Sequence, residues 1–218
     1  MQTVPSYRSW LGWWKAWVAQ SLGSQLLAES GGSQLVEFAV ALPLLVFFTV
    51  GIFDFGSAFT IKQKLAGMAQ EAARVGAAQP ENDLSSTTGD CTQLQAVCAM
   101  RDVVDHSLLS AKVSDCGLSG ASPTWSGSVP NYGPLTWTFT ANTNCPGTLT
   151  LTIGRGYTYT TTLTSPFPNR TYTIEATKVT LSYPYRWQFG KVIGLIAPGS
   201  AFASTSQITS TAVMQNTY

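Results

Sequence analysis

The stretch Leu35–Phe59 reads LVEFAVALPLLVFFTVGIFDFGSAF, and no charged side chain occurs from Phe38 to Phe53. As a helix, these roughly 25 residues would be about 37 Å long, enough to cross a hydrocarbon core of about 30 Å. The alternative is a buried core helix, in which Pro43 would be less well tolerated than in a membrane. A helix that is apolar on all sides also needs an apolar shell, which this small polar chain hardly supplies. We therefore predict a transmembrane helix.

The helix is expected to continue beyond the apolar stretch, because Lys62–Ala78 is rich in alanine and Gln79-Pro80 would stop it. A loop at Glu81–Asp90 follows. Apolar residues then recur with helical period, which predicts a second, amphipathic helix from about Thr92 to Ser110. These residues are Leu94, Val97, Met100 or Arg101, Val104 and Leu108.

The chain after Gly117 has the Thr-rich alternation of half-buried strands. Strands are expected at Leu135–Thr140, Thr148–Ile153, Tyr157–Leu163, Tyr172–Tyr185 and Ala203–Met214. Gly154-Arg155-Gly156 is predicted to be the hairpin turn between two of them. The apolar stretch Val192–Phe202 is too short to span a bilayer and is either a loop facing a partner or part of the core. The predicted fold is α+β, with the long membrane helix continuing into a soluble domain whose second helix packs on an antiparallel sheet.

The composition argues against several classes of function. Charged residues make up 11% of the chain, against about a quarter in ordinary globular proteins, and the net charge is +1. The halves differ: Ser33–Cys116 holds 5 basic and 9 acidic residues, and Gly117–Tyr218 holds 5 basic and 1 acidic. This asymmetry could orient neighbouring copies, but no dense run of Lys and Arg suggests nucleic acid as a partner.

Four cysteines, all beyond the apolar stretch, predict two disulfides in an oxidising compartment. They are Cys91, Cys98, Cys116 and Cys145. Two cysteines seven residues apart on one helix are separated by about 10.5 Å of rise, beyond the roughly 7 Å between Cα atoms that a disulfide allows. Cys91 and Cys98 are therefore expected to pair outward, with Cys116 and Cys145. Zinc is the alternative, but the close ligand pairs of zinc ribbons and fingers are missing.

The residues offer no readable catalytic site. His106 is the only histidine and lies beside acidic residues on the second predicted helix, where a solvated helix face explains it. No nucleophile elbow, phosphate-binding loop or zinc-protease motif is present, so we expect no enzyme activity, no cofactor and no small-molecule substrate. Asp54 within the apolar run could relay protons or recognise a partner; marking the outer membrane interface explains it better.

The entrance to the apolar stretch has an unusual arrangement of charge. An ionised Glu37 near hydrocarbon is costly unless a cation neutralises it. A peptidase cut after Gly32 would make Ser33 the new N-terminus, with Glu37 as its fifth residue and the aromatic Phe38 next. The new amine could then neutralise Glu37 in the same chain or in a neighbour. The alternative is an interfacial glutamate at the mouth of the helix.

This pattern resembles the cleavage site of type IV prepilins. A longer stretch resembles the TadE-like family of tight-adherence (Flp) pilus assembly proteins over about 48 residues. The matching elements are Val36-Glu37-Phe38-Ala39, Leu42-Pro43, Gly51, Phe55-Gly56 and Glu71–Ala77. The resemblance implies an assembly role at the bacterial inner membrane or in the pilus, with processing by a prepilin peptidase after Gly32. It implies other pilin or pseudopilin subunits, pilus assembly proteins and membrane lipid as partners.

We therefore expect a leader at 1–32, a transmembrane and stalk helix at 33–78 and an extracytoplasmic domain at 79–218. Arg8 and Lys15 weakly favour a cytoplasmic N-terminus, and the thiols place the C-terminal part outside. Four tryptophans of the leader share one helical face suited to the membrane interface: Trp10, Trp13, Trp14 and Trp17. The predicted function is that of a minor pilin or pseudopilin. The alternative is an uncleaved bitopic protein whose outer domain binds a ligand or surface.

Overall fold

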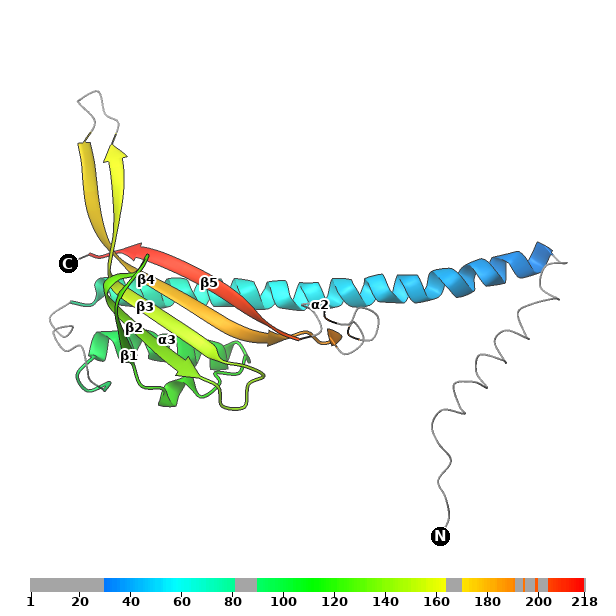
Figure 1. The fold of residues 1–218 in the computed structure, drawn as a ribbon, viewed down its shortest axis with the longest axis horizontal. Helices are drawn as coiled ribbons and strands as arrows, with labels where there is room; N and C mark the ends of the chain where they lie inside the picture. Colours follow the sequence, from blue (N-terminus) through cyan, green and yellow to red (C-terminus); the bar gives the residue numbers. More distant parts are fainter. Residues whose placement is uncertain are drawn as a thin grey trace, which may run out of the picture. The chain divides into compact units, whose positions relative to one another are not determined.

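The computed structural model describes residues 30–80, 90–163, 170–190, 194, 199 and 204–217 (Figure 1). The tryptophan-bearing part of the predicted leader, 1–29, lies outside the described residues, as do nearly all of the predicted loop 81–90 and of the apolar stretch 192–202. The described chain is α+β, with two main helices, a short 3₁₀ helix at Leu118–Gly120 and a five-stranded antiparallel sheet. This is the fold class that the sequence predicts.

Helix α2 runs over Ser30–Ala78 and ends where Pro80 was expected to stop it. The chain divides into two compact units, one ending at Ile52 and the other beginning at Phe53. In the first unit the apolar side chains of α2 are exposed, with Leu35 and Val40 each at 71%. A soluble core helix would bury such side chains. By length and composition, α2 is a candidate membrane span from Gln34.

The second unit contains the sheet, whose strands follow one another in chain order as an antiparallel meander. They are β1 Thr124–Val129, β2 Gly133–Ala141, β3 Leu149–Leu163, β4 Arg170–Arg186 and β5 Thr205–Gln215. Side chains alternate across it as the period of two requires. One cross-strand row, Phe139, Leu151 and Leu181, is buried, and the adjacent row on the other face is Thr138, Thr152 and Thr180.

The core of this unit lies between the sheet, α3 (Gln95–Ser110) and the C-terminal part of α2. The helical period predicted for α3 is confirmed, because its apolar residues are buried: Val97, Met100, Val104 and Leu108. On α2 small side chains such as Ala69, Ala72 and Ala73 are fully buried, which allows the elements to approach closely. At Gly76 an added Cβ would collide with the Met100 side chain.

The predicted hairpin turn at Gly154-Arg155-Gly156 is wrong, because β3 runs through it without a break. The register with β4 shifts between Gly154 and Tyr157, which marks a bulge rather than a turn. An added Cβ at Gly154 would lie 2.5 Å from the Tyr132 carbonyl oxygen. These glycines therefore accommodate a close crossing by the β1–β2 turn.

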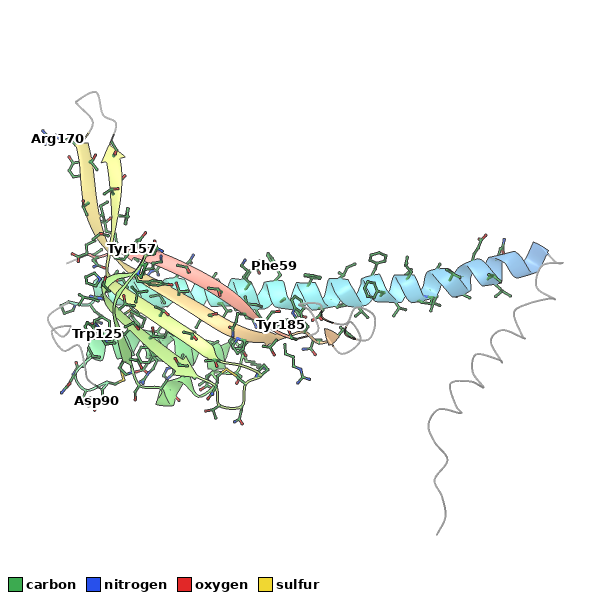
Figure 2. All side chains as sticks on the ribbon, viewed as in Figure 1. Phe59, Asp90, Trp125, Tyr157, Arg170 and Tyr185 are labelled. Carbon is green, nitrogen blue, oxygen red and sulfur yellow. A yellow bond between two sulfur atoms is a disulfide. The ribbon has the colours of Figure 1, made fainter. Side chains whose placement is uncertain are left out.

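Two further features differ from the predicted strands. The sequence does not predict β1, whose alternation is interrupted by two register shifts around Gly127. The outer part of β3, Tyr157–Leu163, pairs only with β4 residues 170–176, because β2 pairs with β3 only as far as Gly154 and β5 pairs with β4 only from Ala176. These residues form a two-stranded extension of the sheet, with Tyr157 labelled at its base and Arg170 at its tip (Figure 2).

Candidate functional site

The predicted cleavage bond, between Gly32 and Ser33, lies inside the first turn of α2, which begins at Ser30. Four residues on, one helical turn away, Glu37 is exposed, and Phe38 is 63% exposed. Within the described part of the chain, the Glu37 carboxylate has no ion pair or hydrogen bond. It borders a shallow groove lined by the apolar side chains of Val36, Val40, Ala41 and Leu44.

This geometry suits neutralisation of Glu37 by a terminal amine. Positions four apart in a helix lie on the same side, about 6 Å apart along the axis. An amine at Ser33 would therefore face Glu37, and the positive N-terminal end of the helix dipole would also favour the carboxylate. Cleavage itself stays a prediction. What the structure adds is that Glu37 is accessible to an amine, whether from its own chain or from a neighbour.

Asp54, at the start of the second unit, is 3% exposed and accepts three hydrogen bonds. The Tyr185 hydroxyl and the Gln188 backbone N–H donate to Oδ1 at 3.2 and 3.1 Å, and the Phe189 N–H donates to Oδ2 at 3.2 Å. Burial, the charge of Asp54 and this hydrogen bond together raise the pKa of Tyr185 to about 12. Asp54 thus fastens the end of β4 and the following turn to α2.

Aromatic packing reinforces this attachment. The Trp187 ring meets Phe55 of α2 edge-on at 5.3 Å and Tyr185 at 5.2 Å between centroids. Its indole Nε1 donates to Ser206 Oγ of β5 at 2.9 Å. Sequence reasoning missed this role of Asp54, because its partners lie more than 130 residues away along the chain. The only local signal was a carboxylate in an otherwise apolar run.

Arg155 provides a second attachment between the sheet and α2. Its side chain is fully buried, and Nη2 donates to the Gln79 carbonyl oxygen at 2.7 Å, just beyond the last residue of α2. Carbonyl groups at a helix C-terminus lack partners within the helix and carry partial negative charge, so a cation is stabilising there. This contact explains why Arg155 lies inside a strand and not at a solvated turn.

All four cysteines are in disulfides, Cys91–Cys98 and Cys116–Cys145, with Cα–Cα distances of 5.5 and 5.4 Å. The predicted outward pairing of Cys91 and Cys98 is therefore wrong. Helix α3 begins only at Gln95, and Cys91 lies in the turn before it, so the helical rise that excluded the pair does not apply. The first disulfide joins the turn before α3 to the first turn of that helix. The second joins the segment after α3 to the connection between β2 and β3.

His106 is exposed on α3, with its Nδ1 2.7 Å from the Asp102 carbonyl oxygen. Among the described residues, no group of three or more His, Cys, Asp or Glu side chains could hold a metal ion. In the second unit, the contacts of Asp54 and Arg155 hold the sheet against α2. In the first unit, the distinctive feature is an exposed apolar helix with one carboxylate near its start.

Residues 32–74 match the family model described as TadE-like protein. The match begins at Gly32, includes Glu37 and Asp54, and falls entirely within α2. The predicted resemblance to the TadE-like family is therefore confirmed for this segment. No curated protein and no solved structure is significantly similar to the chain.

Proposed function

We propose that this chain is a minor-pilin-like or pseudopilin-like subunit acting in the assembly of a tight-adherence (Flp-type) pilus or a related secretion machine. The TadE-like family is associated with such pilus assembly and is typically not enzymatic, and the matched segment is the long helix. The observation that carries the proposal is that the apolar part of this helix is exposed, with no cover from the described residues of its own unit, 30–52.

The exposed helix needs a partner for physical reasons. Burying a large apolar side chain is worth about 1.5–3 kcal/mol, and α2 exposes many of them before Ile52. Lipid supplies that cover in the membrane, and the helices of other pilin or pseudopilin subunits supply it in a fibre or assembly bundle. Transfer between the two environments would leave the folded second unit unchanged.

Glu37 gives this helix a means of recognising its neighbours. In apolar surroundings its carboxylate needs a cation, and the amine of a processed Ser33 is at the right position. Pairing with the amine of an adjacent subunit would favour one axial offset between helices over others. A prepilin peptidase cutting after Gly32 is therefore part of the proposal, as are other assembly proteins as partners.

The proposed topology has one pass through the bacterial inner membrane, with the N-terminus in the cytoplasm. The second unit then lies on the periplasmic or extracellular side, where its two disulfides are chemically stable. Membrane residence and incorporation in the pilus are two stages that this topology allows.

The alternative function, an uncleaved bitopic protein with an outer binding domain, also has an observation in its favour. The helix begins at Ser30, so the Gly32–Ser33 bond lies in helical and not extended backbone. A peptidase would have to unwind this first turn, although helix ends fray readily.

The test is to express the full chain with and without a prepilin peptidase and to determine its N-terminus by mass spectrometry. A terminus at Ser33 that depends on the peptidase and is lost in Gly32→Ala supports the proposal. Glu37→Ala should still be cut but should fail to co-purify with other subunits. An intact N-terminus in the presence of an active peptidase would favour the alternative.

A further inference from the structure

The uncharged run of α2, Phe38–Phe53, is too short to cross a membrane by itself. As a helix it is about 24 Å long, against a hydrocarbon core of about 30 Å, and tilting the helix would widen the difference. A core centred on the run therefore reaches roughly two residues beyond Phe53. In the membrane stage of the proposed function, on which the inference rests, Asp54 then lies at the hydrocarbon boundary. A carboxylate is costly there unless it is covered.

The second unit covers Asp54 with the β4 turn, residues 187–190, which follows the last strand residue, Arg186. The Gln188 and Phe189 backbone N–H groups of this turn donate to the carboxylate at 3.1 and 3.2 Å. The Tyr185 hydroxyl donates to it at 3.2 Å from the end of β4. These distances hold the β4 turn at the same level of α2 as Asp54. In the membrane, the turn therefore lies at the hydrocarbon boundary as well.

The side chains exposed around the β4 turn are of the kinds that favour a membrane interface. Phe55 and Phe59, about one turn apart on α2, are 57% and 61% exposed. Trp187 is half-buried against Phe55, and Arg186 is exposed. Phe59 and Tyr185 are labelled at this end of the second unit in Figure 2. Tryptophan rings favour the headgroup level of a bilayer, and a long arginine side chain can lie along apolar groups while its charge stays in water.

The charge at this end of the unit suits phosphate groups. The segments Phe55–Gln70 and Tyr183–Gly190 carry Lys62, Lys64 and Arg186 and no acidic residue. Of these basic residues, Lys62 and Arg186 have exposed side chains, and Lys64 donates to a backbone carbonyl oxygen. Exposed cations attract lipid phosphates, and arginine can bind one phosphate through two N–H groups. Neither segment has an acid to oppose that attraction.

We propose that the β4 turn and the exposed phenylalanines of α2 form a second membrane contact, seated among the phospholipid headgroups of the periplasmic leaflet. Phe55 and Phe59 lie against the upper acyl chains, Trp187 lies at the headgroup level, and Arg186 binds a lipid phosphate. The turn keeps lipid away from the Asp54 carboxylate. The second unit is then held at the bilayer surface by this contact as well as by α2, which limits how far it can swing about the helix.

The test places the photo-crosslinking amino acid benzoylphenylalanine at exposed Gln188 of the full chain, reconstituted in vesicles of phosphatidylcholine and phosphatidylglycerol. Mass spectrometry should find phospholipid adducts at Gln188 and at Leu44, the positive control in the uncharged run, but not at Glu175, an exposed residue of β4. Adducts at Leu44 without adducts at Gln188 overturn the second contact and leave the membrane span intact. Adducts at neither position overturn both. Equal yields at Gln188 and Glu175, or crosslinks from Gln188 to a second protein chain instead of lipid, also overturn the proposal.

Two further measurements test the named side chains. The fluorescence lost in Trp187→Phe, which keeps an aromatic ring, belongs to Trp187; a nitroxide in the lipid headgroup region should quench it several-fold more than one at the end of the acyl chain. Quenching by neither nitroxide overturns the proposal. Arg186→Gln should lower the adduct yield at Gln188 several-fold, whereas Arg170→Gln, the same change of charge at an exposed residue at the start of β4, should not. An equal fall in both variants overturns the role of Arg186.

Discussion

Replacing Asp54 by alanine should detach the end of β4 from α2. The change removes the acceptor for the Tyr185 hydroxyl and for the backbone N–H groups of Gln188 and Phe189. A hydrogen bond to a charged acceptor contributes about 1.5–3 kcal/mol, and a buried donor left without a partner costs a similar amount. Because the three bonds share one carboxylate, they do not add fully. We expect a loss of about 3–5 kcal/mol in the free energy of unfolding of the second unit.

The assay is thermal unfolding of the full chain in micelles, with hydrogen exchange at the two backbone amides. In a domain of this size, 1 kcal/mol corresponds to roughly 2–4 °C, so Tm should fall by about 6–20 °C. Tyr185→Phe removes one of the three bonds and should cost about 1.5–3 kcal/mol. Glu71→Ala, which breaks an exposed ion pair on the same helix, is the matched control and should change little. If Asp54→Ala behaves like Glu71→Ala, the carboxylate does not fasten the sheet and the reasoning fails.

Three further predictions concern the rest of the second unit. Non-reducing peptide mapping should find Cys91–Cys98 and Cys116–Cys145, and crossed linkages would contradict the structure. Deleting Cys116–Cys145 should cost about 1 kcal/mol more in unfolding free energy than deleting Cys91–Cys98, because it closes the longer loop. Gly154→Ala should destabilise the sheet by about 1–3 kcal/mol, whereas Gly67→Ala, where an added Cβ meets only open space, should be neutral or stabilising by up to about 1 kcal/mol; equal Tm values for the two variants would refute this. Arg155→Ala should cost about 1–3 kcal/mol in urea unfolding, since it leaves the half-buried Gln79 carbonyl without its donor, and wild-type stability would count against that contact.

The helices were predictable because their signals are local. The end of α2 follows from Pro80, and the buried face of α3 follows from residues three and four apart. The prediction of a hairpin turn at the two glycines of β3 is wrong for a physical reason. A Gly-Arg-Gly sequence reads as a turn, but here the missing side chains make room for a carbonyl group from another strand connection. Nothing near Gly154 in the sequence indicates that contact.

The candidate site likewise has one part that the sequence predicts and one part that it does not. The family motif around Glu37 is contiguous, so the sequence alone shows the resemblance, while its processing stays a prediction. The role of Asp54 depends on residues beyond 184, and no pattern in the chain connects the two positions. The disulfide error arose from a helix boundary: moving the start of α3 from about residue 92 to Gln95 places Cys91 outside the helix and makes the short pairing available.

The two-stranded extension at the end of the sheet has a consequence for how the protein behaves at high concentration. Over Tyr157–Leu163, β3 has a free edge in the described part of the chain, so its backbone groups are open to a further strand. Natural sheets usually guard such edges with charge, proline or bulges. The opposite edge carries the charged residues Arg170 and Glu175. Tyr157–Leu163 contains no charged residue and no proline, and the bulge in β3 ends at Tyr157. Unwanted self-association should therefore start at this edge, and a lysine in place of Thr160 would suppress it while leaving the core untouched.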